Sequence, residues 1–380
     1  PMRAILWLTG LLRRRPVELG VGALSIALTV AFVTALGAFV TQSHAALTVR
    51  AAASIPVDWQ VQLTPQGDLA TVMQQLGAVP GVRAVERVDF AHVRALQSTS
   101  AAGERTTGSA YVVSISPSYA AAFSGELRHL LGSATGALLL QQTAANLASG
   151  PGDQISVRTS SGTRSLRVDG IVDMPTEDSF FQVIGLAPGS GASAPPDNVV
   201  LVPPAVFRSV VGPTTVVHQL HASFARDQLP SEPDAAALAI QGRANHFQGD
   251  LAGAALVGDN LGAALTAAGE DARYANLLFL LLGLPALALS ALVAGLVVAL
   301  RSDRRRREVA LLRLRGASNS QVIRIVAAEA VTIAAAGAVL GVPLAVLAID
   351  LALPPATTLD ASWTLAAVTT GLVLAVATQA

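Results

Sequence analysis

Few residues in this sequence have a type and spacing that could support catalysis or metal binding. His218 and His221 are spaced to share one face of a helix, where two imidazoles can ligate a metal. No cysteine and no acidic residue at a fitting spacing completes such a site, so ordinary surface histidines are the better interpretation. Asp173, Glu177 and Asp178 form an acidic cluster that would suit a cation or paired carboxylates, but a solvated loop explains it more simply.

The residue types that are missing exclude several kinds of chemistry. The 380 residues include no cysteine, which excludes disulfides, thiolate zinc sites and cysteine nucleophiles. There is also no lysine, so neither a standard P-loop nor a Schiff base can form. No G-x-S-x-G elbow is present. We expect no catalytic site, no metal site and no cofactor in this chain.

Arginines are concentrated in two short segments that flank apolar runs. Because the net charge is zero and the second cluster abuts an apolar run, membrane orientation and contact with lipid headgroups explain these arginines better than nucleic-acid binding. The positive-inside rule places both segments in the cytoplasm, and the outer loop at 350–362 has Asp350 and Asp360 but no arginine. The orienting arginines are Arg13, Arg14, Arg15, Arg304, Arg305, Arg306 and Arg307.

The composition predicts an integral membrane protein. The chain is 52% hydrophobic and only 13% charged, whereas soluble domains carry about a quarter charged residues. Apolar runs at 19–40, 274–300, 325–349 and 363–380 are each long enough to cross a hydrocarbon core of about 30 Å. A cleaved signal peptide is the alternative for the first run, with residues 43–45 as its cleavage site. We favour a retained helix, since the run exceeds the roughly 7–15 apolar residues of a signal peptide.

These runs predict a bundle of four α-helical membrane segments with a large α+β extracytoplasmic domain between the first two. The fourth run ends with the sequence, which suggests that the chain is a fragment. The predicted segments are a cytoplasmic interfacial helix at 1–16, a first membrane helix at 17–41, the extracytoplasmic domain at 42–272, a second membrane helix at 273–300, a cytoplasmic loop at 301–324, a third membrane helix at 325–349, the outer loop at 350–362 and a fourth membrane helix at 363–380.

The extracytoplasmic domain shows alternating strand patterns interrupted by short helices, as in a mixed sheet with helices on its faces. Ser160-Ser-Gly-Thr163 marks a hairpin, and Asp68 lies near a helix cap. Residues 234–272 are alanine-rich and read as helical. The predicted strands lie at 57–63, within 84–96, and at 111–116, 154–159, 164–172 and 199–202, and the predicted helices at 68–76 and 141–148.

Two features of the third membrane helix bear on packing. Gly337 and Gly341 form a GxxxG pair, which allows close approach of another helix. Glu329 is the one acid within this apolar run, and it lies shallow enough to reach the interface or to pair with an arginine.

Residues 307–318, REVALLRLRGAS, resemble the signature of FtsX-like permeases, the MacB/LolC/FtsX group of ABC-transporter membrane subunits. In that family the segment includes a short coupling helix that docks on an ATPase. Physical features agree, since Gly316 can end a helix and Ser318 or Asn319 can cap the next. The residues that match the pattern are Glu308, Leu311, Leu312, Arg313, Gly316, Ala317 and Gln321.

The resemblance covers nearly the whole chain and implies partners. Residues 150–173 also resemble the second half of a MacB-like periplasmic core domain. The family pairs two permease units with cytoplasmic ABC ATPase subunits that bind ATP and Mg. The second unit would be a copy, a different chain or the other half of a longer protein. The ATPase is not fused in this chain. The implied location, among membrane lipids, is the bacterial cytoplasmic membrane.

The leading hypothesis is therefore a multi-pass permease subunit with a cytoplasmic N-terminus. The resemblance implies that it would transmit ATP-driven motion to its outer domain, a mode of action called mechanotransmission, for export or extraction of a lipid, lipoprotein or peptide. One alternative is a non-transporting FtsX-like regulator that activates a cell-wall hydrolase. Another is a membrane receptor without an ATPase.

Overall fold

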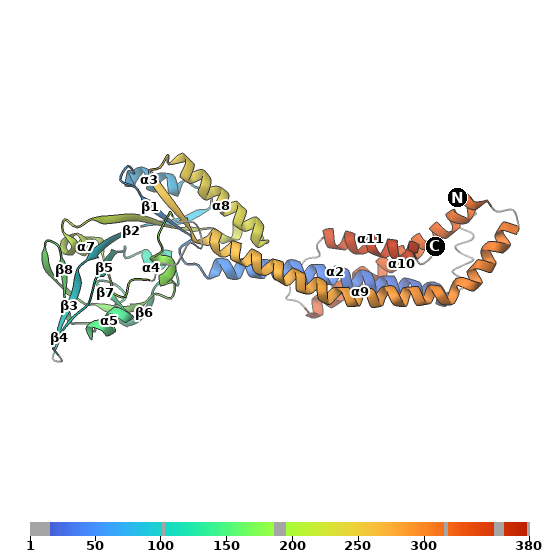
Figure 1. Cartoon of the computed structure of the whole chain (residues 1–380), viewed down its shortest axis with the longest axis horizontal. Coiled ribbons are helices and arrows are strands. Elements are labelled where there is room, and N and C mark those ends of the chain that lie inside the picture. The colour runs from blue at the N-terminus through green and yellow to red at the C-terminus, as the bar shows by residue number, and fades with distance from the viewer. Residues whose placement is uncertain (1–15, 101–102, 186–194, 315–317, 353–360, 378–380) are drawn as a thin grey trace. The chain divides into compact units, whose positions relative to one another are not determined.

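The computed structural model describes residues 16–100, 103–185, 195–314, 318–352 and 361–377, and they fall into two units (Figure 1). A helical unit comprises Pro1–Ala46 and Asp271–Ala380. A sheet domain comprises Leu47–Glu270. Each unit is described separately below.

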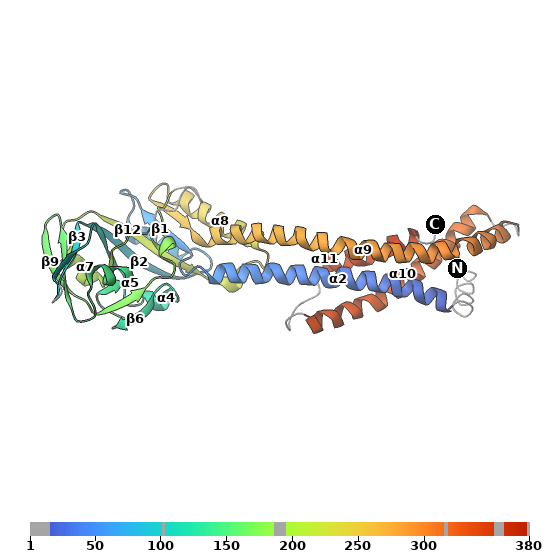
Figure 2. The same ribbon diagram turned by 60° about the horizontal axis from the view of Figure 1, so that its bottom comes forward.

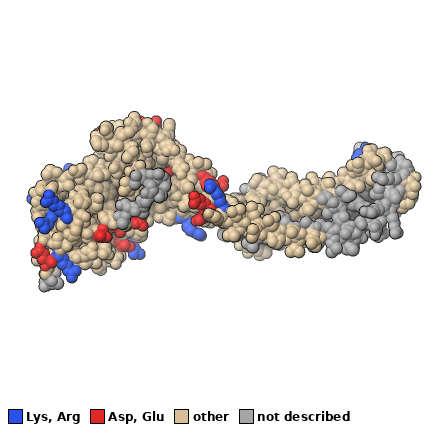
Figure 3. Space-filling view, viewed as in Figure 1, with Lys and Arg blue, Asp and Glu red and all other residues tan. Residues whose placement is uncertain are grey.

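Four long helices contribute to the helical unit: α2 (Pro16–Ala53), α9 (Asn260–Leu314), α10 (Asn319–Ala352) and α11 (Ala361–Ala377). Among the described residues, Gly20–Ala53 and Asn319–Ala352 are long and apolar enough to cross a membrane, and Ala361–Val376 is a shorter apolar helix. Figure 3 shows few charged side chains on the described part of this unit. The elements run past the predicted segment boundaries, because α2 continues to Ala53 and α9 is one helix from Asn260 to Leu314.

Helices α2 and α9 lie side by side within the helical unit (Figure 2). The rings of Phe39 and Phe279 meet edge to face with centroids 5.0 Å apart. His44 Nε2 lies 3.1 Å from Asn276 Oδ1. These contacts connect the two helices that lead into the sheet domain.

The GxxxG glycines of α10 lie against α2. A Cβ on Gly341 would stand 2.6 Å from the carbonyl oxygen of Ala27, and one on Gly337 would stand 2.5 Å from Ile26 Cγ2. On α2, Gly37 likewise leaves room for the indole of Trp363 from α11. Small residues therefore let three helices pack at short range, as membrane helices do where no hydrophobic effect drives them together.

The sheet domain is built on a nine-stranded mixed sheet in the order β13-β1-β12-β2-β5-β11-β7-β10-β6. Most neighbouring pairs are antiparallel, whereas β5/β11 and β7/β10 are parallel. The strands are β1 (Trp59–Leu63), β2 (Val82–Val93), β5 (Ala110–Ser114), β6 (Arg128–Gly132), β7 (Leu138–Leu140), β10 (Gly170–Asp173), β11 (Val199–Val202), β12 (Val216–Phe224) and β13 (Ala255–Asp259).

A smaller sheet has the order β4-β3-β8-β9. Its strands are β3 (Ala95–Ser100), β4 (Gly103–Thr106), β8 (Gln154–Thr159) and β9 (Gly162–Arg167). The predicted hairpin is confirmed by the antiparallel pairing of β8 with β9. The helices of the domain are α3 (Leu69–Gly77), α4 (Tyr119–Ala122), α5 (Gln141–Leu147), α6 (Glu177–Phe180), α7 (Pro204–Val211), the 3₁₀ turn η1 (Arg226–Gln228) and α8 (Pro233–Asp250).

Both faces of the nine-stranded sheet are covered, so successive side chains along a strand point into two different hydrophobic cores. One face packs against α3 and α8 at one end, and against α5, α7 and the smaller sheet at the other. The opposite face packs against α4 and α6, with Tyr119 and Phe180 fully buried. Burial on both faces explains why several strands read as continuous apolar runs.

Two expectations for this domain are wrong. Residues 234–272 are not one helical stretch, because the edge strand β13 separates α8 from α9. Residues 164–172 do not form one strand, because the chain leaves the smaller sheet after Arg167 and enters the larger sheet at Gly170. The prediction that Asp68 caps a helix is confirmed, since its carboxylate accepts a bond from Thr71 N at 2.9 Å.

We predict that Gly341→Ala lowers the thermal stability of the full chain in detergent. The added methyl would meet backbone rather than a movable side chain. Overpacking of this kind costs roughly 1–3 kcal/mol. Gly20→Ala is the matched control, since no atom lies within 4 Å of its Cβ position. Equal unfolding temperatures for both variants would contradict the packing described for α10 and α2.

Candidate functional site: the joint between the long helices and the sheet

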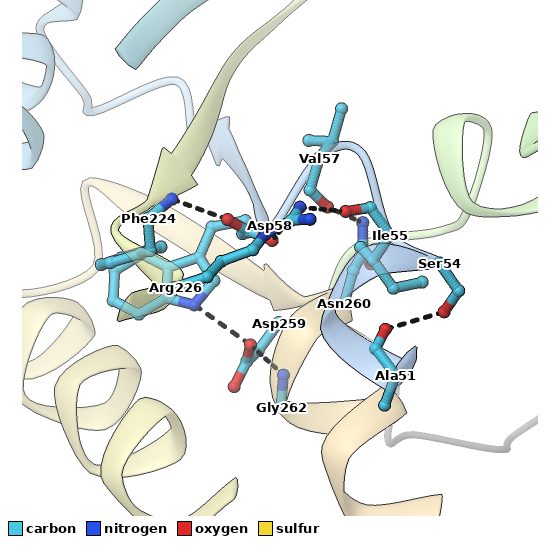
Figure 4. Close-up of polar contacts among 11 residues, drawn as sticks. Ala51, Ser54, Ile55, Val57, Asp58, Phe224, Arg226, Asp259, Asn260 and Gly262 are labelled. Carbon is cyan, nitrogen blue, oxygen red and sulfur yellow. Dashed lines mark hydrogen bonds and ion pairs between the residues drawn. The ribbon is translucent and has the colours of Figure 1, made fainter. Parts of the chain in front are cut away.

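The last turn of α2 and the first turn of α9 attach to neighbouring strands, β1 and β13. The backbone of Asp58 connects them. Its N–H donates to Ala222 O at 3.0 Å, and its carbonyl accepts from the N–H groups of Asn260 and Leu261, each at 3.1 Å. We call this region the joint (Figure 4). It comprises residues 51–58, 224–226 and 259–262, all within the sheet domain.

The carboxylate of Asp58 is fully buried in the joint. Its Oδ2 accepts a 2.6 Å bond from Phe224 N, and its Oδ1 lies 3.4 Å from Arg226 Nη2. The same guanidinium nitrogen donates to the carbonyl of Ile55 at 2.5 Å, just after α2 ends. Desolvation raises the pKa of Asp58 to about 6, and the bond from Phe224 together with the charge of Arg226 opposes that rise.

Asp259 caps the first turn of α9. Its Oδ1 accepts bonds from Gly262 N at 2.7 Å and from Trp59 Nε1 at 3.1 Å. Its Oδ2 is buried and has no hydrogen-bond partner among the described residues. Burial raises the pKa of Asp259 to about 6, and the negative charge of Asp58 adds to the rise. Gly262 leaves room for this carboxyl, because a Cβ at position 262 would displace the Asp259 side chain from its capping position.

Trp59 connects the joint to the core of the domain. It is fully buried and contacts Phe224, with ring centroids 4.6 Å apart, and Phe247 of α8, with centroids 6.0 Å apart. A displacement of either helix end therefore has to move the sheet or break several buried hydrogen bonds. Each buried group left unsatisfied costs about 1–3 kcal/mol. The joint thus links both helix ends rigidly to the sheet.

The two histidines considered as metal ligands lie on strand β12 and therefore share no helix face. Their spacing of three puts them on opposite faces of the strand. The preferred interpretation of both as surface histidines is wrong for His221, which is fully buried. His221 is buried and bonds Tyr119 Oη at 2.8 Å, whereas His218 Nδ1 lies 2.7 Å from Asp89 Oδ1. Desolvation lowers the pKa of His221 to about 3. No group of three or more His, Cys, Asp or Glu side chains in the described part of the chain is placed to hold a metal.

The acidic cluster lies around α6. Asp173 pairs with Arg128 at 2.6 Å, and Glu177 begins the helix. Burial, followed by repulsion from Asp178, Asp173 and Asp197, raises the pKa of Glu177. The cluster is separate from the joint and shows no sign of paired catalytic carboxylates.

The residues predicted to dock on an ATPase lie near the end of α9 and the start of α10. Glu308, Leu311, Leu312 and Arg313 belong to α9, together with Arg304, Arg305, Arg306 and Arg307. Gly316 and Ala317, and the orienting Arg13, Arg14 and Arg15, lie outside the described residues.

Gln321 completes a capping box at the start of α10. Its Oε1 accepts from Ser318 N at 3.1 Å, and its own N–H donates to Ser318 Oγ at 3.3 Å. Ser318 is therefore the capping residue of the two that the sequence allowed. The capping box fixes where α10 begins, and it includes Gln321, the last of the predicted docking residues.

Sequence reasoning missed the joint. Its side-chain contacts between segments join positions 166 to 203 residues apart, which no local pattern reveals. The available signals were weak: an aspartate at the second position of the predicted strand 57–63, Asp58, and Asp259 with a glycine three residues on.

Two described helices long and apolar enough to cross a membrane, together with a large mixed-sheet domain with helices on its faces, fit an integral membrane protein. Two family models match the sequence: the MacB-like periplasmic core domain over residues 20–241, more than half of the chain, and the FtsX-like permease C-terminal region over residues 280–379. The chain therefore belongs to the FtsX-like permeases that carry a MacB-like periplasmic core domain.

Two solved structures are similar to the chain at low identity. The periplasmic region of MacB from Actinobacillus actinomycetemcomitans is 11% identical, with a TM-score of 0.35, covering 56% of this chain and 92% of that one. The extracellular domain of the noncanonic ABC-type transporter YknZ from Gram-positive bacteria is 14% identical, with a TM-score of 0.31, covering 52% and 99%. A comparison with curated protein sequences found no match.

Asp259→Asn should make the stability of the protein less dependent on pH. A raised folded-state pKa gives stabilisation that is complete below the unfolded value of 3.8 and is lost as pH rises through about 6. Asparagine keeps both accepted hydrogen bonds without the charge. As the pH rises from 4 to 8, we expect the free energy of unfolding of the variant, relative to that of the wild type, to increase by roughly 1–3 kcal/mol. Thermal unfolding at each pH measures this difference. A stability difference that does not change with pH would contradict this account of Asp259.

Arg226→Met should destabilise the chain by roughly 2–4 kcal/mol, because it leaves the buried Asp58 carboxylate without its counter-ion. The matched control is Arg83→Met. Arg83 pairs with the neighbouring Asp227, but both side chains are more than half exposed. An exposed pair of this kind contributes about 0–1 kcal/mol. Equal losses for the two variants in denaturant titrations would show that the joint does not depend on the Arg226 interaction.

Proposed function

We propose that this chain is the permease subunit of an ABC transporter and that it carries ATP-driven motion from a cytoplasmic ATPase to its sheet domain. The observation that carries the proposal is the continuity of α9. One helix contains both Glu308, in the predicted docking segment, and Asn260, whose N–H donates to the carbonyl of Asp58 in the joint. A continuous helix can pass a displacement or rotation along its length, which a flexible loop cannot.

The joint supports the same proposal, since it ties the ends of both long helices to one sheet edge. Arg226 connects the end of α2 to Asp58, and the Asp58 carbonyl holds the start of α9. Movement at either helix would thus be delivered to β1 and β13 together. This is a mechanical role, and the ATP and Mg would be bound by the partner ATPase.

The full arrangement that we propose has four membrane helices, a cytoplasmic N-terminus and an extracytoplasmic sheet domain in a bacterial cytoplasmic membrane. The arginines at 13–15 and 304–307 would set this orientation. A second permease unit would complete the transporter. The cargo would be a lipid, lipoprotein or peptide. Co-purification of an ATP-binding subunit in mild detergent would eliminate the receptor without an ATPase.

The double variant Glu308→Arg/Gly316→Trp should lose the ATPase partner while remaining in the membrane. The charge reversal and the bulky residue both act on the predicted docking segment. We expect at least a tenfold loss of co-purified ATPase activity at unchanged membrane abundance. Asp303→Arg is the matched control, because it reverses a charge on the same helix outside the docking set. If the double variant retained ATPase binding and ATP-driven function, the docking assignment would be wrong.

A further inference from the structure

Neighbouring residues at the joint point to opposite faces of the sheet. Trp59 pairs with Asp259 on the face that packs against α8, whereas Gln60 pairs with Gly258 on the face covered by α6. Asn260, which directly follows Asp259 in the chain, also reaches the α6 side. The start of α9 is therefore held from both faces of the sheet, and the contacts on the α6 side extend beyond the joint described above.

A network of side-chain amides, in which Gln60 and Asn260 are buried and Gln182 is half-buried, connects the start of α9 to α6. Gln182 Nε2 donates to Asn260 Oδ1 and, at 3.0 Å, to Gln60 Oε1. Gln60 is fully buried, and its Nε2 donates to the carbonyls of Ser179 at 2.9 Å and Phe180 at 3.2 Å. Directional bonds of this kind are strong in a low-dielectric interior and costly to leave unmade.

Close packing reinforces the amide network. A Cβ on Gly258 would stand 3.2 Å from Gln182 Nε2 and 3.3 Å from Ile184 Cγ1. The glycine therefore lets the segment of α6 and the residues after it, 177–185, lie against β13. Phe180 packs against His221, with ring centroids 5.2 Å apart. The segment thus contacts the strand that leads directly into α9.

A side-chain contact of a different kind lies at the other end of α6. Thr176 Oγ1 donates at 3.0 Å to Oε2 of Glu126, which follows α4. Glu126 is fully buried, and its Oε1 has no hydrogen-bond partner in the described part of the chain. A four-residue helix has no stability of its own, so the position of α6 depends on these contacts.

We propose that residues 177–185 are a responding element whose docking on the sheet is energetically coupled to the first turn of α9 through Gln182 and Gln60. The physiological trigger, motion of α9, rests on the proposed function; the coupling itself does not. Coupling free energies are reciprocal, so loosening α6 from its far end must also loosen the first turn of α9.

The test is hydrogen–deuterium exchange of the full chain in phospholipid nanodiscs, with no nucleotide or ATPase present. Thr176→Val removes the bond to Glu126 and touches no residue of α9. We expect exchange to rise at least threefold in residues 177–181 and in residues 260–265. Thr214→Val, which removes an equivalent bond to Val211 O next to α7, should change neither region.

A second variant locates the coupling. In a Gln182→Leu background, Thr176→Val should no longer affect residues 260–265, whereas Gln142→Leu, on the exposed face of α5, should leave the effect intact. The amides of β11 serve as the internal reference. Faster exchange in α6 with none in α9, an effect that survives Gln182→Leu, or an equal rise in β11 would each overturn the proposal. None of these results depends on an ATPase, so failure here and failure of the proposed function are separate outcomes.

Discussion

The sheet domain depends on one constraint: the peptide and carboxyl groups of Asp58 must be satisfied where no water reaches them. The backbone of Asp58 bonds β12 and the start of α9, and its side chain bonds Phe224 N and Arg226. Moving any of these elements alone would leave a buried polar group unpaired. The requirement to satisfy buried polar groups therefore makes two helix ends and three strands behave as one body.

This constraint explains the otherwise costly acid at the helix cap. Asp259 keeps a buried oxygen without a partner, near a second carboxylate. In return, the cap fixes the first turn of α9 against Trp59 and the core. Gly262 and Gly258 serve the same end on opposite faces of the sheet, one admitting the Asp259 carboxyl and the other admitting Gln182.

Elements with local signals were predicted well from the sequence. The bounds of β8 and β11 and the cap at Asp68 follow from alternation, turn residues and capping preference. Strand β12 was missed because His218, Gln219 and His221 break its apolar alternation, and the buried imidazole is satisfied by Tyr119 from a distant segment. Strand β13 was missed because Ala255–Asp259 lies between two alanine-rich helices. The docking segment came from resemblance alone, and the joint came only from tertiary contacts.

The most direct measurement of the central claim is hydrogen–deuterium exchange at the joint in the full chain, reconstituted with its ATPase, with and without trapped ATP. If α9 carries motion to the sheet, exchange in residues 58–61 and 259–263 will change when ATP is trapped. The same residues will not respond in Glu308→Arg/Gly316→Trp. Identical exchange at the joint in the nucleotide-free and ATP-trapped states of the wild type would contradict the account.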